Sequence, residues 1–145
     1  MEVAVEARAH TRRVIAAAED LLSQLRDAET SQRGYALTGD EAFLEPYLIG
    51  RDSIAGYLGD LRQNIRISAG QTHLDALPPL IDAKLAELAQ VIALRQKNQM
   101  ADVLARVKSG QGKRLMDAIR VEINALLQIE EAALAQLEVE FQSSL

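Results

Sequence analysis

The stretch DAETSQRGYALTGDEAFLEPY, residues 27–47, decides the fold. Apolar residues at three- and four-residue spacing lead into it, which predicts a helix that reaches Leu37. Gly39 suits the left-handed position just beyond a helix because it has no Cβ to clash there. Asp40 suits the N-cap of the next helix, since its carboxylate can accept hydrogen bonds from the free N–H groups of the first turn. Residues 38–40 therefore predict a tight reversal between two helices.

Helical periodicity extends on both sides of this reversal. The first helix is expected over residues 2–37, and residues seven positions apart mark its core face: Val14, Leu21, Ala28 and Tyr35. The second is expected from Asp40 to about Ile67. Pro46 lies near its start, where it removes one backbone donor. We expect residues 41–45 to form a loose first turn that leads into a continuous helix.

The remaining chain predicts two more helices. A second corner is expected at residues 68–70, and Pro78-Pro79 should interrupt a helix or lie in its first turn. A third helix then runs from Leu80 to about Val107, and a fourth covers residues 113–142 after a glycine-containing corner. Four long helices joined by short corners predict an all-α, antiparallel up-down-up-down bundle. Its two long outer helices are the first and the fourth, and both chain ends lie at the same end.

Composition agrees with helices and excludes several classes of function. Of the 145 residues 48% are apolar, yet the chain has only two Phe, three Tyr and no Trp. Such Ala- and Leu-rich composition is typical of packed helices. A net charge of −5 argues against a nucleic-acid binder. The absence of Cys excludes disulfides and thiolate metal sites, and no apolar run approaches the ~20 residues that span a bilayer.

No catalytic or cofactor motif is present. His10 and His73 are isolated, so the paired Glu-x-x-His spacing of di-iron bundles is missing. Covalent haem attachment would need Cys-x-x-Cys-His, and non-covalent haem is left as a remote alternative. The glycines of residues 110–114 lack the spacing of a phosphate loop. We therefore predict a domain with no enzymatic activity, no metal and no cofactor.

Several polar residues gather near the predicted reversal. Glu29 and Arg33 have the spacing and order of a helix ion pair. Together with Gln32 and Asp40 they are predicted to form a polar cluster that stabilises the corner, with direct ligand contact as the alternative. Lys113 and its neighbour Arg114 would lie at the positive end of a helix dipole, which is unfavourable unless an acidic group or anion is close.

Two further groups of residues are candidates for a site. Tyr35 and Tyr47 flank the reversal, where packing on one another is favoured over stacking on a ligand. Glu130 is a carboxylate on the inner row of the fourth helix, and a buried carboxylate needs a partner or becomes neutral. Counting from the reversal places it opposite residues 12–19 of the first helix. We interpret it as a structural or dimer-register pair, with a signalling element as the alternative.

The residues around the reversal also resemble a known family. Arg33-Gly34-Tyr35-Ala36-Leu37-Thr38-Gly39-Asp40 is preceded by Glu29 and Gln32 and followed by Phe43-Leu44 and Pro46-Tyr47. This pattern resembles the signature of the third type of CHASE domain, an extracellular sensory domain of bacterial histidine kinases and cyclases. Weaker similarity continues through residues 81–95 and 112–131. The resemblance implies a four-helix bundle that forms a parallel homodimer. The signature residues that it marks are Glu29, Gln32, Arg33, Tyr35, Thr38, Gly39, Asp40, Pro46 and Tyr47.

The expected function follows from this resemblance. Residues 1–145 are expected to form one periplasmic sensory domain, cut from a longer membrane protein whose flanking transmembrane helices are absent from this chain. The parent is expected to be a two-component sensor histidine kinase, and a small molecule or a protein would shift its helices. Two alternatives are left open: attachment to a diguanylate cyclase or chemoreceptor, and a cytoplasmic helical scaffolding module.

Overall fold

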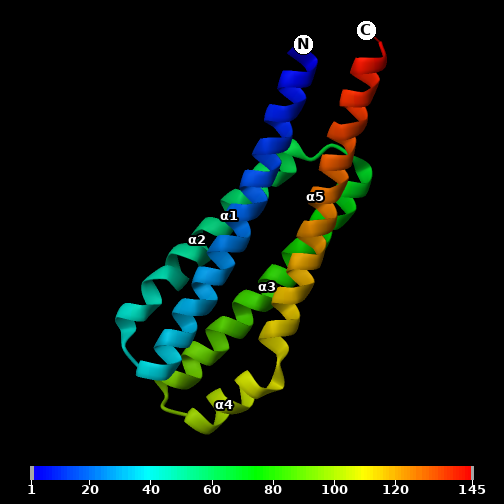
Figure 1. Cartoon of the computed structure of the whole chain (residues 1–145). Coiled ribbons are helices and arrows are strands. Elements are labelled where there is room, and N and C mark those ends of the chain that lie inside the picture. Colours follow the sequence, from blue (N-terminus) through cyan, green and yellow to red (C-terminus); the bar gives the residue numbers. More distant parts are fainter. Residues whose placement is uncertain (1, 145) are drawn as a thin grey trace.

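Within residues 2–144, which the computed structural model describes, the chain forms five α-helices and one short 3-10 helix, with no strand. In order these are α1 (Glu2–Thr38), η1 (Glu41–Leu44), α2 (Glu45–Asn64), α3 (Ser68–Gln96), α4 (Met100–Ser109) and α5 (Gln111–Ser143). Figure 1 shows α1, α2, α3 and α5 running antiparallel to their chain neighbours, with α4 across one end. The predicted all-α four-helix bundle is confirmed. Residues 1 and 145 of the expected domain lie outside the described residues.

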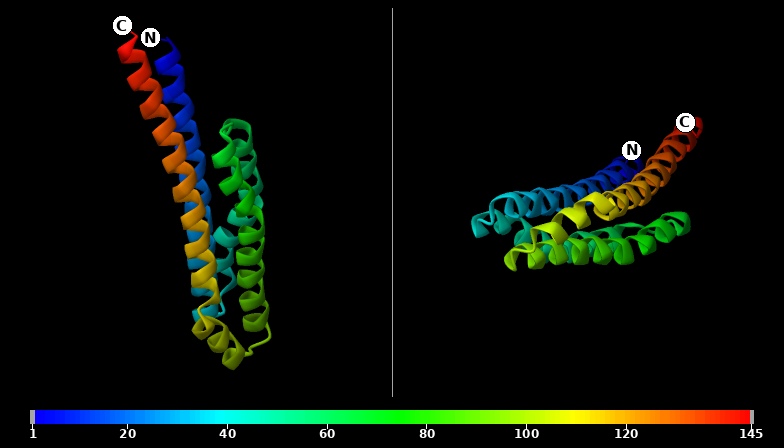
Figure 2. Two further views of the ribbon diagram at one scale, coloured as in Figure 1. Left: turned by 90° about the vertical axis from the view of Figure 1, so that its right-hand side faces the viewer. Right: turned by 90° about the horizontal axis from the view of Figure 1, so that it is seen from below.

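The two outer helices are the longest, as predicted, with 37 residues in α1 and 33 in α5. Both extend past the corner between α2 and α3, and the two chain ends lie at the same end of the bundle (Figure 2). We call these projecting turns, residues 2–6 and 138–143, the overhang. The end that carries the α1–η1 reversal and α4 is the distal end.

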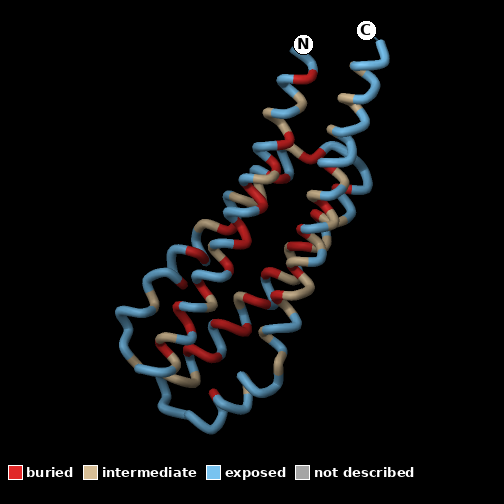
Figure 3. The backbone as a smooth tube through the Cα atoms, viewed as in Figure 1, coloured by how far each residue is buried: buried red, intermediate tan, exposed pale blue. Residues whose placement is uncertain are grey.

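The core lies along the inner faces of the four long helices (Figure 3). All four members of the seven-residue row predicted for the first helix are buried, at 3% exposure or less. Apolar residues from the other helices meet them; among those with 3% exposure or less are Ile54, Leu61, Leu77, Ile81, Ile119, Ile123 and Leu126. Burial of apolar surface from four helices is the main stabilising contribution to this bundle.

The reversal at residues 38–40 has the predicted geometry. Gly39 has a φ of 69°, and its N–H donates to the carbonyl of Tyr35 over 2.7 Å. The Thr38 hydroxyl donates to the carbonyl of Gly34 and accepts from the N–H of Asp40. The Asp40 carboxylate then accepts from the N–H of Ala42 over 2.9 Å, as an N-cap does. Both expectations about this corner are confirmed.

The start of the second helix is held by a serine from α1. The expected loose turn is η1, and α2 begins at Glu45 with Pro46 in its first turn. Phe43 O and Tyr47 N have the spacing of a helical hydrogen-bond pair, but they are not bonded to each other. The buried Ser31 hydroxyl lies between them instead, since it donates to the Phe43 carbonyl and accepts from Tyr47 N over 3.1 Å.

The second corner differs from the prediction. It consists of residues 65–67, and α3 begins at Ser68, where a turn was expected. Pro78-Pro79 lies inside α3 and does not interrupt it. The residues around it explain this difference, because Leu74, Leu77 and Ile81 are all buried in the core. Packing of this face therefore outweighs the helical hydrogen bonds that the two prolines remove.

The predicted third helix is also divided. It ends at Gln96, about three turns before the expected end at Val107, and α4 follows as a separate helix. Asn98 has a φ of 56°. Its N–H donates to the carbonyl of Arg95, and Gln99 N–H donates to that of Leu94, which is the Schellman arrangement at a helix end. Asparagine tolerates this left-handed conformation better than most residues, so the helix stops without a glycine.

Candidate functional site

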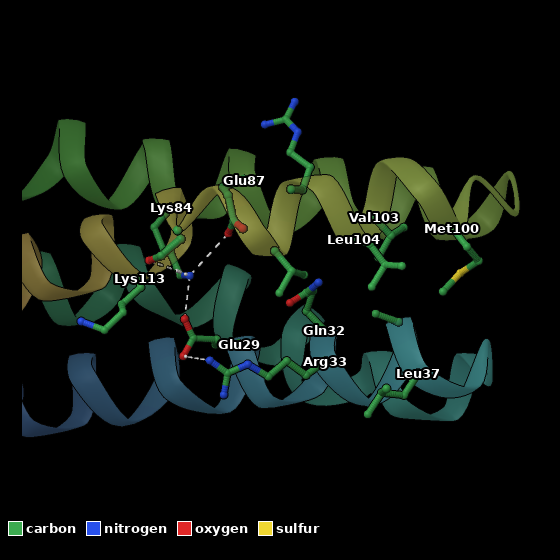
Figure 4. Close-up of a pocket in the computed structure, with 15 residues that line it drawn as sticks. Glu29, Gln32, Arg33, Leu37, Lys84, Glu87, Met100, Val103, Leu104 and Lys113 are labelled. Atoms are coloured by element: carbon green, nitrogen blue, oxygen red, sulfur yellow. Dashed lines mark hydrogen bonds and ion pairs between the residues drawn. The ribbon is translucent and has the colours of Figure 1, made fainter.

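A cavity of about 350 Å³ opens at the distal end between α1, α3, α4 and the start of α5 (Figure 4). One part of its lining is apolar and consists of Ala36, Leu37, Met100, Val103, Leu104 and Val107. The polar part consists of Glu29, Gln32, Arg33, Lys84, Glu87, Arg106 and Lys113, with the backbone of Gly110 and Gly112. A volume of this size and a mixed lining are typical of small-molecule sites.

Lys84 of α3 lies at the polar end of the cavity and is only 1% exposed. Its Nζ is 2.7 Å from Glu29 Oε2 and 3.4 Å from Glu87 Oε2, and it donates to the Gly112 carbonyl over 3.2 Å (Figure 4). The ammonium group therefore joins α1, α3 and α5. Sequence reasoning missed Lys84. The signal that could have found it is its spacing, three residues after the buried Ile81 and four before the buried Leu88.

The predicted polar cluster at the corner is only partly brought together. Arg33 Nη2 lies 3.2 Å from Glu29 Oε1, as expected for the helix pair. Asp40 caps η1 and belongs to the reversal, so it does not join them. Gln32 is 5% exposed and lines the cavity. In Figure 4 its amide points into the space between α1 and α4, and no hydrogen bond joins it to another of the residues drawn.

The corner is instead tied to α3 by Arg95, which the sequence analysis did not single out. Arg95 Nε donates to the carbonyl of Ala36 over 3.0 Å, and its Nη1 donates to Asn98 Oδ1 over 2.8 Å. A guanidinium at the last carbonyls of α1 complements the negative end of the helix dipole. This side chain therefore links the end of α1 to the end of α3.

Tyr35 and Tyr47 are buried together and do not line the cavity. Their exposures are 3% and 7%, and both belong to a core cluster with Ala28, Leu88 and Ile92. The Arg51 guanidinium lies 5.9 Å from the centre of the Tyr47 ring, within the range of a cation–π contact. The arrangement accords with the interpretation of these tyrosines as packing residues.

The basic residues at the start of α5 have neighbours that offset the unfavourable dipole. Lys113 Nζ lies 2.7 Å from Asp117 Oδ2. The hydrogen bond from Lys113 lowers the pKa of Asp117 below its ordinary value. Arg114 Nη1 donates to the Ser109 carbonyl at the end of α4, where the α4 dipole is negative. The Glu87 carboxylate also lies beside the first turn of α5, close to Gly112. Acidic groups therefore lie close to this helix start.

Glu130 lies at the opposite end of the core and is 3% exposed. Its Oε2 is 3.6 Å from His10 Nε2, and its Oε1 is buried without a hydrogen-bond partner. Burial raises the pKa of Glu130 above its ordinary value, and His10 partly opposes that shift. A smaller cavity of about 150 Å³ adjoins the pair, with Arg66 in its lining.

Glu130 lies nearer to residues 12–19 than to Arg33, as expected, but the residue that it meets is His10, two positions outside that range. The prediction placed the start of the fourth helix level with the reversal at Thr38. In the structure α4 occupies that level, and α5 begins level with Glu29, where Gly112 meets Lys84. Every residue of α5 is therefore shifted toward the overhang, and Glu130 meets His10.

Two further properties concern the described residues as a whole. Across residues 2–144 no three His, Asp or Glu side chains gather in a group that could hold a metal ion. None of the helices in that range is both long enough and apolar enough to cross a bilayer.

Comparison with known proteins gives a family and a structural relative. The family model described as the CHASE3 domain matches residues 4–140. The crystal structure of the Rhodopseudomonas palustris histidine kinase HK9 sensor domain is 29% identical in sequence and superimposes with a TM-score of 0.75, covering 86% of this chain and 98% of that one. No curated protein matches the chain.

Proposed function

The chain belongs to the CHASE3 domain family, and from this premise we propose that it is the extracytoplasmic signal-sensing domain of a transmembrane sensor histidine kinase. The likeness to the HK9 sensor domain over 86% of the chain supports a kinase as the parent protein. In this proposal the domain itself catalyses nothing. It converts a stimulus into a displacement of α5 relative to α1.

The position of the overhang is the observation that carries this proposal. α1 and α5 leave the bundle at the same end, beyond the α2–α3 corner (Figure 2). A domain inserted between two membrane helices needs this geometry, because its entry and exit must face the same bilayer surface. The same two helices also line the distal cavity, through Glu29 to Leu37 on α1 and Gly112 and Lys113 on α5. A change at the cavity can therefore reach both exits along continuous helices.

Transmission requires two arrangements of these helices. A ligand shifts the balance between them only if it binds one arrangement more tightly than the other. Helix displacements of about 1–2 Å are common in such switches. We propose that the domain acts as a parallel homodimer, in which exposed valines of the overhang, Val3, Val5 and Val139, are covered by the second copy.

Labelling in intact cells tests the location. The chain has no cysteine, so Asp20→Cys, on an exposed position of α1, introduces a unique thiol into this domain. In the full-length parent protein, cleared of other thiols, a membrane-impermeant maleimide should label this cysteine in intact cells. Labelling that occurs only after lysis would contradict the proposal and favour a cytoplasmic helical module.

A cross-link between the exits tests the mechanism. Ala7 of α1 and Leu134 of α5 line the same small cavity. A short bifunctional maleimide that joins Ala7→Cys to Leu134→Cys should change the autophosphorylation rate of the parent kinase several-fold. Each single cysteine variant, treated in the same way, is the control. An unchanged rate in the joined protein would count against displacement of α5 relative to α1. Sedimentation of the chain measures the dimer directly.

A further inference from the structure

We propose that the distal cavity binds a small uncharged amphiphile that has an apolar chain and a carboxamide-like head group. The inference deepens the proposed function, since the bound molecule would be the stimulus of the sensor. It is carried by the Gln32 amide, by the charge balance around Lys84 and by the exposed apolar residues of α4.

Gln32 marks the place of the head group. The Gln32 amide lies in the cavity wall, where a bound molecule can supply the hydrogen bonds that water makes in its absence. Gln32 is 5% exposed, its amide points into the cavity, and no dashed line joins it to another of the residues drawn in Figure 4. An amide offers both a donor and an acceptor. The complementary head group therefore also offers one of each, as a carboxamide does.

The charges beside Gln32 favour an uncharged head group. Lys84 is paired with Glu29 and Glu87, and Arg33 with Glu29, so these two cations balance the two lining carboxylates. The third lining cation, Arg106 of α4, donates instead to the Gln111 amide oxygen over 3.4 Å. Lys113 is paired with Asp117 and points away from the cavity in Figure 4. A cationic head group would have to break one of these pairs or remain without a counter-charge, and an anionic one would have to break a pair or draw Arg106 away from Gln111.

The apolar chain of the ligand has its own part of the lining. Leu104 and Val107 of α4 are 53% and 61% exposed, and Leu37 of α1 is 84% exposed, although all three line the cavity. An apolar chain lying along them would remove this surface from water, at about 25 cal/mol for each Å² buried. A cavity of about 350 Å³ accommodates a molecule the size of octanamide.

The few buried contacts of α4 suit a site that closes on its ligand. α4 is ten residues long, has Val103 as its buried residue, and is joined to the rest through the left-handed residues Asn98 and Gly110. Few buried contacts allow a segment to move without unfolding the remainder. A chain bound against Leu104 and Val107 would draw α4 toward α1. It would also bear on the first turn of α5, which leads to the overhang.

Binding of octanamide to the whole chain tests this proposal. We expect saturable binding by titration calorimetry, with shifts of the Gln32 side-chain amide signals in NMR spectra. Octanoate and octylamine have the same chain but charged heads, and should bind at least about tenfold more weakly, because the lining carboxylates are already paired and octanoate would compete with Gln111 for Arg106. The octanoate arm also tests Arg106, the lining cation that has no carboxylate partner among the described residues. Tighter binding of octanoate than of octanamide would overturn the proposal.

Substitutions locate the site. Gln32→Leu should weaken octanamide binding about tenfold, the effect of losing hydrogen bonds worth ~1.4 kcal/mol, while the melting temperature is maintained or raised. Gln63→Leu, at an exposed position of α2 away from the cavity, is the matched control and should change nothing. If Gln32→Leu impairs folding, Val107→Trp should fill the cavity and abolish binding, whereas Val121→Trp, at a 65% exposed position of α5, should not.

Two outcomes would overturn the inference without touching the proposed function. Octanamide that does not bind, or that binds Gln32→Leu and Val107→Trp as tightly as the parent chain, would show that the cavity takes no such ligand. A dimer that dissociates on Leu104→Ser substitution would show that a second copy covers the apolar lining. The sensor proposal would stand in both cases, since it is tested by labelling and cross-linking in the parent kinase.

Discussion

His10 Nε2 and Glu130 Oε2 lie 3.6 Å apart across the interface between α1 and α5, beside a small cavity that Arg66 and Ile67 of the α2–α3 corner also line. The second carboxylate oxygen of Glu130 is buried without a partner. This acid therefore joins the two helices that leave the bundle, and it does so with an incompletely satisfied charge. Its protonation state bears directly on how tightly those helices hold together.

The stability of the domain should depend on pH through Glu130. Burial raises the folded-state pKa of Glu130 above its ordinary value of 4.5. A raised pKa means that the protonated acid is favoured in the folded chain, so its contribution is fully present below pH 4.5 and is lost as the pH rises through the folded-state pKa. Glu130→Gln imitates the protonated form. The melting temperature of Glu130→Gln should therefore exceed that of the unsubstituted chain at pH 7, and the difference between the two should shrink toward pH 4.

Melting curves of both proteins between pH 4 and 8 measure this effect. The control for loss of an acid from α5 is Glu138→Gln on the overhang. The Glu138 side chain is 36% exposed, and its carboxylate pairs with Arg8. A constant difference between Glu130→Gln and the parent chain across this range would refute the assignment. Arg66 lines the adjoining cavity, so the comparison is repeated with Arg66→Gln.

Lys84→Met should be among the most damaging single changes at the distal end. It removes the ammonium that faces Glu29 and Glu87 and leaves the buried Glu87 and the partly buried Glu29 carboxylates without it. Breaking a buried ion pair in this way costs roughly 3–5 kcal/mol. Chemical denaturation measures the loss, and adding Glu29→Gln and Glu87→Gln to Lys84→Met should recover much of it. Lys113→Met is the control at the same end. The Lys113 side chain is 82% exposed in its ion pair with Asp117, so its loss should leave the unfolding midpoint almost unchanged.

Ser31→Ala should weaken the start of α2. The substitution removes the hydroxyl that bridges the Phe43 carbonyl and the Tyr47 N–H, and leaves both groups without that partner. Each buried group left unsatisfied costs about 1–3 kcal/mol, so a loss of about 2–3 kcal/mol in unfolding free energy is expected. Ser53→Ala is the control, because that hydroxyl bonds only to the carbonyl of its own helix turn. Equal effects of the two substitutions would show that Ser31 is not a bridge.

Gly39→Ala should destabilise the reversal, for two reasons. The φ of 69° costs a residue with a Cβ about 1–2 kcal/mol, and that Cβ would lie 2.5 Å from Arg95 Nη2. Gly56→Ala has open space around its Cβ in the middle of α2 and should instead stabilise by about 0.5–1 kcal/mol. Thermal unfolding of the two variants distinguishes the cases. A melting temperature of Gly39→Ala equal to that of the parent chain would contradict the left-handed geometry.

The parts of the fold that were predictable are governed by neighbours in sequence. The reversal follows from Gly39 and Asp40 because a left-handed residue and an N-cap act within a few residues of themselves. The buried row of α1 follows from periodicity, which reports which face of a helix is apolar. These local rules gave the number, order and direction of the long helices.

The misplaced features depend on contacts between distant residues. Pro78-Pro79 looks like a break until the packing of Leu77 and Ile81 against the other helices is known. Lys84 looks like a surface residue because its partner Glu29 is 55 positions away. α3 ends just before Asn98, where the sequence has no glycine or proline that would indicate a helix end. That early end placed α4 across the bundle and moved α5 along α1, so the partner of Glu130 was misassigned.

α4 presents one buried side chain, Val103, while its other faces meet the cavity or solvent. Substitutions on those faces disturb little of the core that holds α1, α2, α3 and α5 in register. Related sensor domains would therefore be free to vary the sequence of α4 and to acquire a different ligand specificity, while the packing of α1, α2, α3 and α5 stays the same. The distal cap is the place where sensors of this design can diversify at little risk to their folding.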